Sequence, residues 1–73
     1  MSSLVTYENQ SPEYINAGDH VVDSFGRDFI AQTNAEKDQF GYVNVRDASM
    51  RWIAYEINDR VSLTYDESLY AEV

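Results

Sequence analysis

The clearest alternation of apolar and polar positions lies in the second half of the chain. Three segments, 40–46, 50–57 and 61–65, are rich in Val, Ile, Tyr, Trp and Thr, and polar stretches at 47–49 and 58–60 separate them. β-branched and aromatic residues favour extended strands, and short polar clusters between such runs favour turns. The pattern therefore predicts a three-stranded antiparallel meander.

The loop between the second and third of these segments decides which side chains face each other. A three-residue loop at 58–60 puts the apolar side chains of both strands on one face, whereas a two-residue loop would mix apolar and polar side chains. The pairs expected from the three-residue loop are Ile57 with Val61, Tyr55 with Leu63, and Ile53 with Tyr65. A helix over 47–58 also fits the apolar spacing, but the Trp, Ile and Tyr content favours strands.

Residues 19–33 fit two different elements. As a helix, their apolar side chains form one stripe and their polar side chains lie on the opposite side. As a hairpin, strands at 20–23 and 28–33 flank a turn in which Gly26 takes a positive φ. The hairpin leaves Phe25 exposed at its tip, and the helix places a glycine in its interior at a cost of about 1 kcal/mol. We favour the hairpin.

These patterns together predict a mainly β fold for a small single domain over residues 1–73. We expect an antiparallel meander or a small barrel of about five strands. Ser11 as a cap and Pro12 at the first helical position predict one additional helical turn. The alternative is an α+β fold in which residues 19–33 form a helix packed on a three- to four-stranded antiparallel sheet.

One short string resembles a known family. Val43-Asn44-Val45-Arg46 is similar to the opening of bacterial SH3-like repeats. The resemblance covers four residues, and 47–49 replace the Gly-Pro-Ser type of continuation found in those repeats. What it implies is a small barrel.

Length and cysteine content limit how such a fold is stabilised. The chain has 73 residues and no cysteine, which excludes disulfides and thiolate metal sites. A domain of this size buries only about 60% of the surface that its unfolded chain exposes. Homo-oligomerisation or a bound partner is therefore an expected source of additional stability.

No segment predicts export or membrane insertion. Residues 1–8 contain neither a basic residue nor an apolar run like that of a signal peptide. The longest uninterrupted apolar stretch, 52–55, is far shorter than the roughly 20 residues that cross a bilayer. We expect a soluble cytoplasmic protein without membrane contact, located in the host cytoplasm if it is phage-encoded.

Acidic residues dominate the charge and lie mainly towards the two ends of the sequence. The formal net charge is -8. Residues 1–26 hold four acidic residues and no Lys or Arg, residues 61–73 hold three and none, and residues 27–60 hold six acidic and five basic residues. Such a field repels nucleic acid phosphates and anionic lipids and attracts basic surfaces. We therefore expect a protein partner with a basic surface and no direct binding of nucleic acid.

The chain lacks the residue patterns of a catalytic or cofactor site. His20, with Asp19 and Asp23 nearby, is the single histidine, and without a paired motif it indicates a surface histidine rather than a general base or metal ligand. The three glycines are too far apart for a phosphate loop, and no segment has the alternating acids of a calcium loop. We expect no enzyme activity, no cofactor and no metal.

Aromatic residues are the second unusual feature of the composition. The chain has six Tyr, three Phe and one Trp, and Tyr and Trp are favoured anchors of binding interfaces. Carboxylates interleaved with Tyr rings pair with Arg and Lys and stack on their flat or aliphatic parts. The partner-binding residues that we predict are Glu8, Glu13, Asp19, Asp23, Asp66, Glu67, Glu72, Tyr7, Tyr65 and Tyr70.

Together these features predict a non-enzymatic acidic binding protein. We expect an inhibitor or regulator that docks on a basic surface of a nucleic-acid-handling protein by charge mimicry, with carboxylates where phosphates would lie. In size and charge the chain resembles small acidic anti-defence proteins of phages and mobile elements. The alternative is a small structural or assembly subunit, such as a virion component, that self-associates through exposed strand edges.

Overall fold

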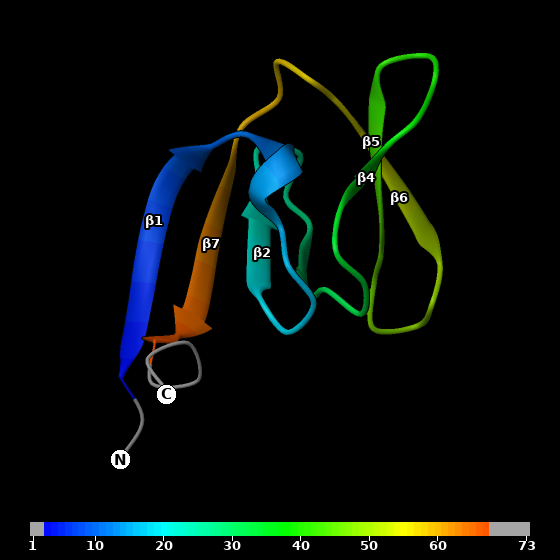
Figure 1. The fold of residues 1–73 in the computed structure, drawn as a ribbon. Helices are drawn as coiled ribbons and strands as arrows, with labels where there is room; N and C mark the ends of the chain where they lie inside the picture. The colour runs from blue at the N-terminus through cyan, green and yellow to red at the C-terminus, as the bar shows by residue number, and fades with distance from the viewer. Residues whose placement is uncertain (1–2, 68–73) are drawn as a thin grey trace.

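Two antiparallel sheets form the fold in the computed structural model, which describes residues 3–67 of the chain (Figure 1). The elements in chain order are β1 (Leu4–Gln10), the single-turn 3-10 helix η1 (Pro12–Tyr14), β2 (His20–Asp23), β3 (Asp28–Ile30), β4 (Glu36–Lys37), β5 (Tyr42–Arg46), β6 (Trp52–Glu56) and β7 (Val61–Asp66). Sheet A has the strand order β1-β7-β2-β3, and sheet B has the order β4-β5-β6. The mainly β prediction is confirmed.

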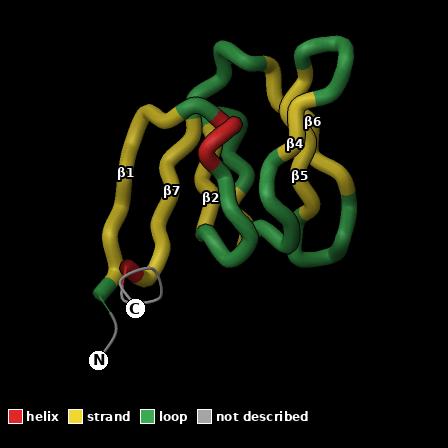
Figure 2. Tube along the Cα trace, in the orientation of Figure 1, coloured by secondary structure: helices red, strands yellow, loops and turns green. Residues whose placement is uncertain are grey.

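The described residues contain more strands than the sequence predicts, and the sheets do not close into a barrel. Seven strands in two sheets stand in place of a meander or barrel of about five. The difference arises because the segment Leu4–Gln10 forms a full strand and the two-residue β4 extends sheet B. Figure 2 shows strands and loops along nearly the whole described chain. Within it, no helix is long and apolar enough to cross a membrane.

Residues 19–33 form the hairpin of β2 and β3, so the helix alternative for this segment is wrong. The Asp23 carboxylate organises the turn, because its Oδ1 accepts the backbone N–H of Phe25 at 3.0 Å and that of Arg27 at 2.8 Å. Gly26 has a φ of +89°, a conformation that other residues reach only with strain. Phe25 is exposed at the tip, and the Arg27 guanidinium lies 5.1 Å from its ring centre.

The predicted meander is correct for its first two strands only. β5 and β6 pair antiparallel over five residue pairs, and the alternative helix over 47–58 is wrong. β7 belongs to the other sheet, so the predicted pairs across the last loop are wrong: Ile57 with Val61, Tyr55 with Leu63, and Ile53 with Tyr65. The Asp59 carboxylate accepts the N–H of Glu56 at 2.9 Å. The chain therefore turns after β6 and crosses to sheet A.

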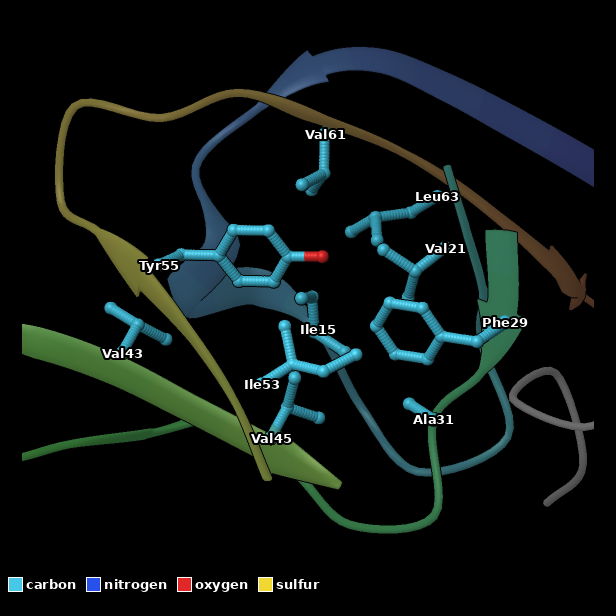
Figure 3. Close-up of a cluster of buried hydrophobic side chains, with 10 residues drawn as sticks. All are labelled: Ile15, Val21, Phe29, Ala31, Val43, Val45, Ile53, Tyr55, Val61 and Leu63. Atoms are coloured by element: carbon cyan, nitrogen blue, oxygen red, sulfur yellow. The ribbon is translucent and has the colours of Figure 1, made fainter. Parts of the chain in front are cut away.

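The faces of these strands are as predicted, although their neighbours are not. Figure 3 shows Ile53 and Tyr55 from β6 pointing into the same core as Val61 and Leu63 from β7, from the opposite sheet. Alternation determines which side of a strand is buried, but it does not determine which strand lies beside it. The buried hydrophobic core consists of Ile15, Val21, Phe29, Ala31, Val43, Val45, Ile53, Tyr55, Val61 and Leu63.

β7 is an inner strand of sheet A, although it follows all the other strands along the chain. It pairs antiparallel with β1 on one side and with β2 on the other, and Figure 1 shows β1 and β7 side by side. The backbone N–H of Glu67 donates to the carbonyl of Ser3 at 2.8 Å, which extends this contact. Sequence patterns did not predict the pairing, because no turn joins β1 to β7.

The predicted helical turn is confirmed as η1. The Ser11 hydroxyl accepts the backbone N–H of Glu13 at 3.3 Å, and Pro12 occupies the start of the helix. Pro12 is buried. The turn thereby fixes where the chain leaves β1 and sets the position of Tyr14 at its end.

A buried hydrogen bond joins the two sheets. The fully buried Tyr55 donates its hydroxyl to Asp23 Oδ2 at 2.7 Å, and Arg27 Nε donates to the same oxygen at 2.6 Å. Burial alone would raise the pKa of Asp23, but the hydrogen bonds from Tyr55 and Arg27 outweigh it and hold the pKa below its usual value. Burial and the Asp23 carboxylate together raise the pKa of Tyr55 well above its usual value. The pair therefore stays an ionised acid and a neutral phenol at neutral pH.

Replacing Tyr55 by Phe removes the hydroxyl and keeps the ring. We expect the free energy of unfolding to fall by about 1.5–3 kcal/mol, because a buried carboxylate loses a donor. Urea unfolding measures this as a lower midpoint at an unchanged m-value. Tyr42→Phe is the control, since Tyr42 is 46% exposed, and it is expected to cost less than about 0.5 kcal/mol. Equal losses would contradict the proposed role of the Asp23–Tyr55 bond.

Replacing Asp23 by Asn tests the charge of the same group. A carboxyl whose pKa is depressed by folding stabilises the fold above its unfolded pKa of about 3.9, and the contribution is lost as the pH falls through the folded pKa. We expect Asp23→Asn to be less stable than the wild type by about 2 kcal/mol at neutral pH, with the difference shrinking in acid. Urea unfolding of both proteins at several pH values measures it. A difference that grows on acidification would contradict the assignment.

Candidate functional site

Sheet A and η1 collect the acidic segments of the chain. β1, η1, β2 and β7 contain no Lys or Arg, and all five basic residues of the sequence lie within 27–60. Two of these flank sheet A, and both are held by internal bonds: Arg27 by the Asp23 carboxylate, and Arg60 by the carbonyls of Ile57 and Asp59. The pairing of β1 with β7 places the two acidic segments next to each other.

The predicted acidic residues occupy different environments. The set comprises Glu8, Glu13 and Glu67, which are exposed, Asp66, which is half-buried, and Asp19 and Asp23, which are buried. Glu8 and Glu13 lie towards one end of the β1–β7 pair, whereas Asp66 and Glu67 lie at the other end. Glu72 and Tyr70 lie outside the described residues. The structure thus brings the acidic segments into one sheet without gathering their carboxylates into one cluster.

Asp23 has an internal role. Its carboxylate accepts four hydrogen bonds, from the backbone of Phe25, the backbone and side chain of Arg27, and the hydroxyl of Tyr55. A buried carboxylate with this many donors has no capacity left for a partner molecule. We therefore leave Asp23 out of the proposed contact residues.

A pocket of about 320 Å³ lies between η1 and the core-facing side of β1 and β7. Its lining consists of Tyr7, Gln10, Tyr14, Asn16, Asp19, Leu63 and Tyr65. Three of these were predicted as partner-binding residues: Tyr7, Asp19 and Tyr65. The pocket combines aromatic walls with a carboxylate, which is the composition of a site for a cationic group.

Tyr7 and Tyr65 form one wall of this pocket. They lie on neighbouring strands, and their rings stack with centroids 5.8 Å apart and an angle of 20° between planes. A side-chain hydrogen bond with Tyr7 raises the pKa of Tyr65, and burial and the nearby charges of Glu67 and Asp19 raise it further. Tyr65 therefore remains a neutral phenol at neutral pH.

A bulge in β1 places Gln10 beside this wall. Between the pairs Tyr7–Leu63 and Gln10–Val61, β1 advances by three residues while β7 advances by two. Asn9 takes up the extra residue with a φ of +59°, a conformation that Asn tolerates better than most side chains. Gln10 consequently shares the core-facing side with Tyr7 instead of facing away from it.

Asp19 supplies the charge of the pocket. It belongs to a tight turn in which the Asn16 N–H donates to Asp19 Oδ2 at 2.9 Å and the Asp19 N–H donates to the Asn16 carbonyl at 3.0 Å. The residue is only 1% exposed, and Oδ1 meets no hydrogen-bond partner among residues 3–67. Burial raises the pKa of Asp19, and the bond from Asn16 opposes this only in part. An unsatisfied buried carboxylate is costly to fold and marks a candidate functional group.

The other large clefts of the described structure carry both signs of charge. Two have volumes of about 470 Å³. Their charged lining residues are Arg27, Asp28, Asp47 and Arg51 in one and Glu36, Lys37 and Asp38 in the other. When opposite charges lie next to each other in a cleft, a charged ligand gains less binding free energy from either of them. The pocket at Asp19 differs because its lining holds one charged residue and no counter-charge.

His20 lies away from this pocket, on the outer face of sheet A. It pairs with Asp28 on the neighbouring strand. On the same face, the hydroxyls of Thr6 and Thr64 share a hydrogen bond of 2.8 Å. Throughout residues 3–67, no group of three or more His, Cys, Asp or Glu side chains is arranged to hold a metal ion.

Sequence reasoning missed four residues that line the pocket: Gln10, Tyr14, Asn16 and Leu63. Tyr14 ends the helical turn that Ser11 and Pro12 signal, so this turn could have pointed to it. The position of Gln10 depends on the bulge, which no sequence pattern indicated. Leu63 was predicted correctly as a core-facing residue, but with the wrong neighbour.

Replacing Asp19 by Asn removes a buried charge while keeping the side-chain volume. A carboxyl whose pKa is raised by folding favours the fold below its unfolded pKa of about 3.9, and that stability is lost as the pH rises through the folded pKa. We therefore expect Asp19→Asn to be more stable than the wild type at neutral pH and equally stable in acid. Urea unfolding of the wild type and of Asp19→Asn at several pH values measures this difference in stability. A variant that is less stable at neutral pH would contradict an unsatisfied charge at this position.

Comparisons with protein-family models, with curated proteins and with solved structures found no match.

Proposed function

We propose that this chain is a non-enzymatic acidic binding protein that docks on a basic surface of a nucleic-acid-handling protein and thereby inhibits or regulates it. The observation that supports this best is the distribution of charge, because β1, η1, β2 and β7 adjoin one another and carry no Lys or Arg. Carboxylates on these elements would take the positions of phosphates on the partner, and they repel nucleic acid itself.

Exposed tyrosines on the same elements as the exposed acids would supply contact area. Tyr7 is 44% exposed and precedes Glu8, and Tyr14 is 64% exposed and follows Glu13. A tyrosine ring offers a large amphipathic surface at a low cost in conformational entropy, because it has only two rotatable side-chain bonds. Adjacent carboxylates and rings suit partners rich in Arg and Lys.

Capture from a cell lysate on the immobilised protein tests the proposal. We expect the retained proteins to be enriched in nucleic-acid-handling proteins and to be released as the salt concentration rises from about 50 to 500 mM, because exposed charges are screened. Added duplex DNA is expected to release the same proteins, since it competes for their basic surfaces. Retention that neither salt nor DNA affects would contradict charge mimicry.

Two double variants with the same net charge locate the docking surface. Glu8→Gln with Glu13→Gln neutralises two exposed acids of β1 and η1, and Glu36→Gln with Glu56→Gln neutralises two exposed acids of sheet B. We expect the first pair to weaken binding of a captured protein at least about tenfold, or ~1.4 kcal/mol. The second pair is expected to weaken it by less than about twofold. Equal losses would show dependence on net charge alone.

The exposed edge of sheet A supports a second candidate function. β1 is an edge strand of seven residues, and Leu4 on it is 70% exposed. The unpaired backbone groups of an edge strand can pair with another copy of the chain, as in a small structural or assembly subunit such as a virion component. Light scattering distinguishes the candidates. A monomer agrees with the acidic binder, and a defined ring or higher oligomer agrees with the assembly subunit.

A further inference from the structure

The pocket between η1 and the β1–β7 pair contains the Asp19 carboxyl group, and no basic residue is in its lining. Asp19 Oδ1 is buried there without a hydrogen-bond partner, and the remaining lining is aromatic, amide or aliphatic. We infer that this pocket receives an arginine side chain of the protein partner, with the guanidinium group on Asp19 and its flat face against the tyrosine rings. The inference rests on the proposed function, for which it supplies a specific anchor.

A cation is the ligand that the Asp19 carboxylate would gain most from. Burial removes the water that would solvate the carboxylate, and its hydrogen bonds within the protein replace only part of that solvation free energy. An opposite charge within hydrogen-bond distance supplies the remainder. The backbone N–H of Asn16 donates to Asp19 Oδ2 and not to Oδ1. The second oxygen is therefore the acceptor that remains for a donor from outside the chain.

The walls favour a guanidinium group over an ammonium group. Tyr7, Tyr14 and Tyr65 line the pocket, and a planar guanidinium stacks on aromatic faces and is more weakly hydrated than an ammonium group. It also carries five N–H donors. The amide oxygens of Asn16 and Gln10, both in the lining, are suitable acceptors for donors that Asp19 does not use.

Access to Asp19 requires one wall to move. The residue is 1% exposed, so an incoming group has to displace a side chain before it reaches Oδ1. Tyr14 is the least constrained wall, since it is 64% exposed and ends a helix of only three residues. Tyr14 lies on none of the strands, so its ring can move without altering sheet A.

Such an anchor would act differently from the exposed acids. Charges on the surface are screened by salt and contribute mainly to the rate of encounter. A cation enclosed with Asp19 is screened much less, so it contributes to residence time and to the choice of partner. The exposed glutamates would attract a basic surface, and the pocket would select one arginine on it.

Small amides that carry the amino-acid side chains test the inference directly. Nα-acetyl-arginine amide is the probe, and Nα-acetyl-citrulline amide is a neutral compound of nearly the same shape. In an NMR titration we expect the arginine compound to shift the ring signals of Tyr7, Tyr14 and Tyr65 and the amide signal of Asp19. The citrulline compound is expected to bind at least about tenfold more weakly, and Nα-acetyl-lysine amide more weakly than arginine.

Asp19→Asn is the decisive variant, because it removes the charge and is expected to fold at least as stably as the wild type. Glu56→Gln removes the same charge from an exposed position of sheet B. We expect Asp19→Asn to weaken arginine amide binding at least about tenfold and Glu56→Gln to leave it unchanged within about twofold. Equal binding of citrulline and arginine, wild-type binding by Asp19→Asn, tighter binding of lysine, or no shift in the pocket would each overturn the inference.

The outcomes separate this inference from the proposed function. Binding of the arginine compound at Asp19, together with an absence of salt-sensitive protein capture, would support the pocket and contradict the proposed function. Salt-sensitive capture that Asp19→Asn leaves unchanged, together with no effect of the arginine compound, would support the proposed function and overturn the pocket.

Discussion

The Asp23 carboxylate links the β2–β3 hairpin of sheet A to β6 of sheet B through a buried hydrogen bond from Tyr55. Hydrophobic burial is not directional, whereas a hydrogen bond between the sheets requires a specific distance and orientation. The bond from Tyr55 fixes one point of β6 against the end of β2, and the bonds from Phe25 and Arg27 close the turn at the same place. A chain with no cysteine thus relies on a buried polar network for specificity.

Asp19 and Asp23 show how context separates two buried acids on the same short segment. Both are buried, yet folding raises the pKa of Asp19 and lowers that of Asp23. Asp23 is surrounded by donors from three residues, whereas Asp19 receives one backbone N–H and retains an oxygen without a partner among residues 3–67. Stability alone would favour replacing Asp19, so its presence beside aromatic walls agrees with a role in binding. We therefore assign a structural role to Asp23 and a role in the proposed binding to Asp19.

Local chemistry explains which parts of the structure could be predicted from sequence. The Ser11–Pro12 cap, the Gly26 turn and the buried faces of β6 and β7 each depend on residues within one element, and these predictions are confirmed. The pairing of β1 with β7 and the crossing of the chain after β6 depend on contacts between distant segments, which alternation does not encode. The pocket forms only because the β1–β7 pairing, the crossing after β6 and the Asn9 bulge occur together. Tyr7, Tyr65 and Asp19 were therefore predicted as individual binding residues but not as one site, and Tyr14 was not predicted.

The inner position of β7 has a consequence for the order of folding. The hairpin of β5 and β6 is local and can form early, but sheet A is incomplete until the segment Val61–Asp66 inserts between β1 and β2. Ser3 and Asp66, joined by a hydrogen bond of 3.0 Å, are 63 positions apart. Contacts of such sequence separation slow folding, because loop closure precedes the gain from pairing. During synthesis the backbone edges of β1 and β2 that pair with β7 therefore wait for this strand, and this interval is when the chain is most exposed to aggregation and proteolysis.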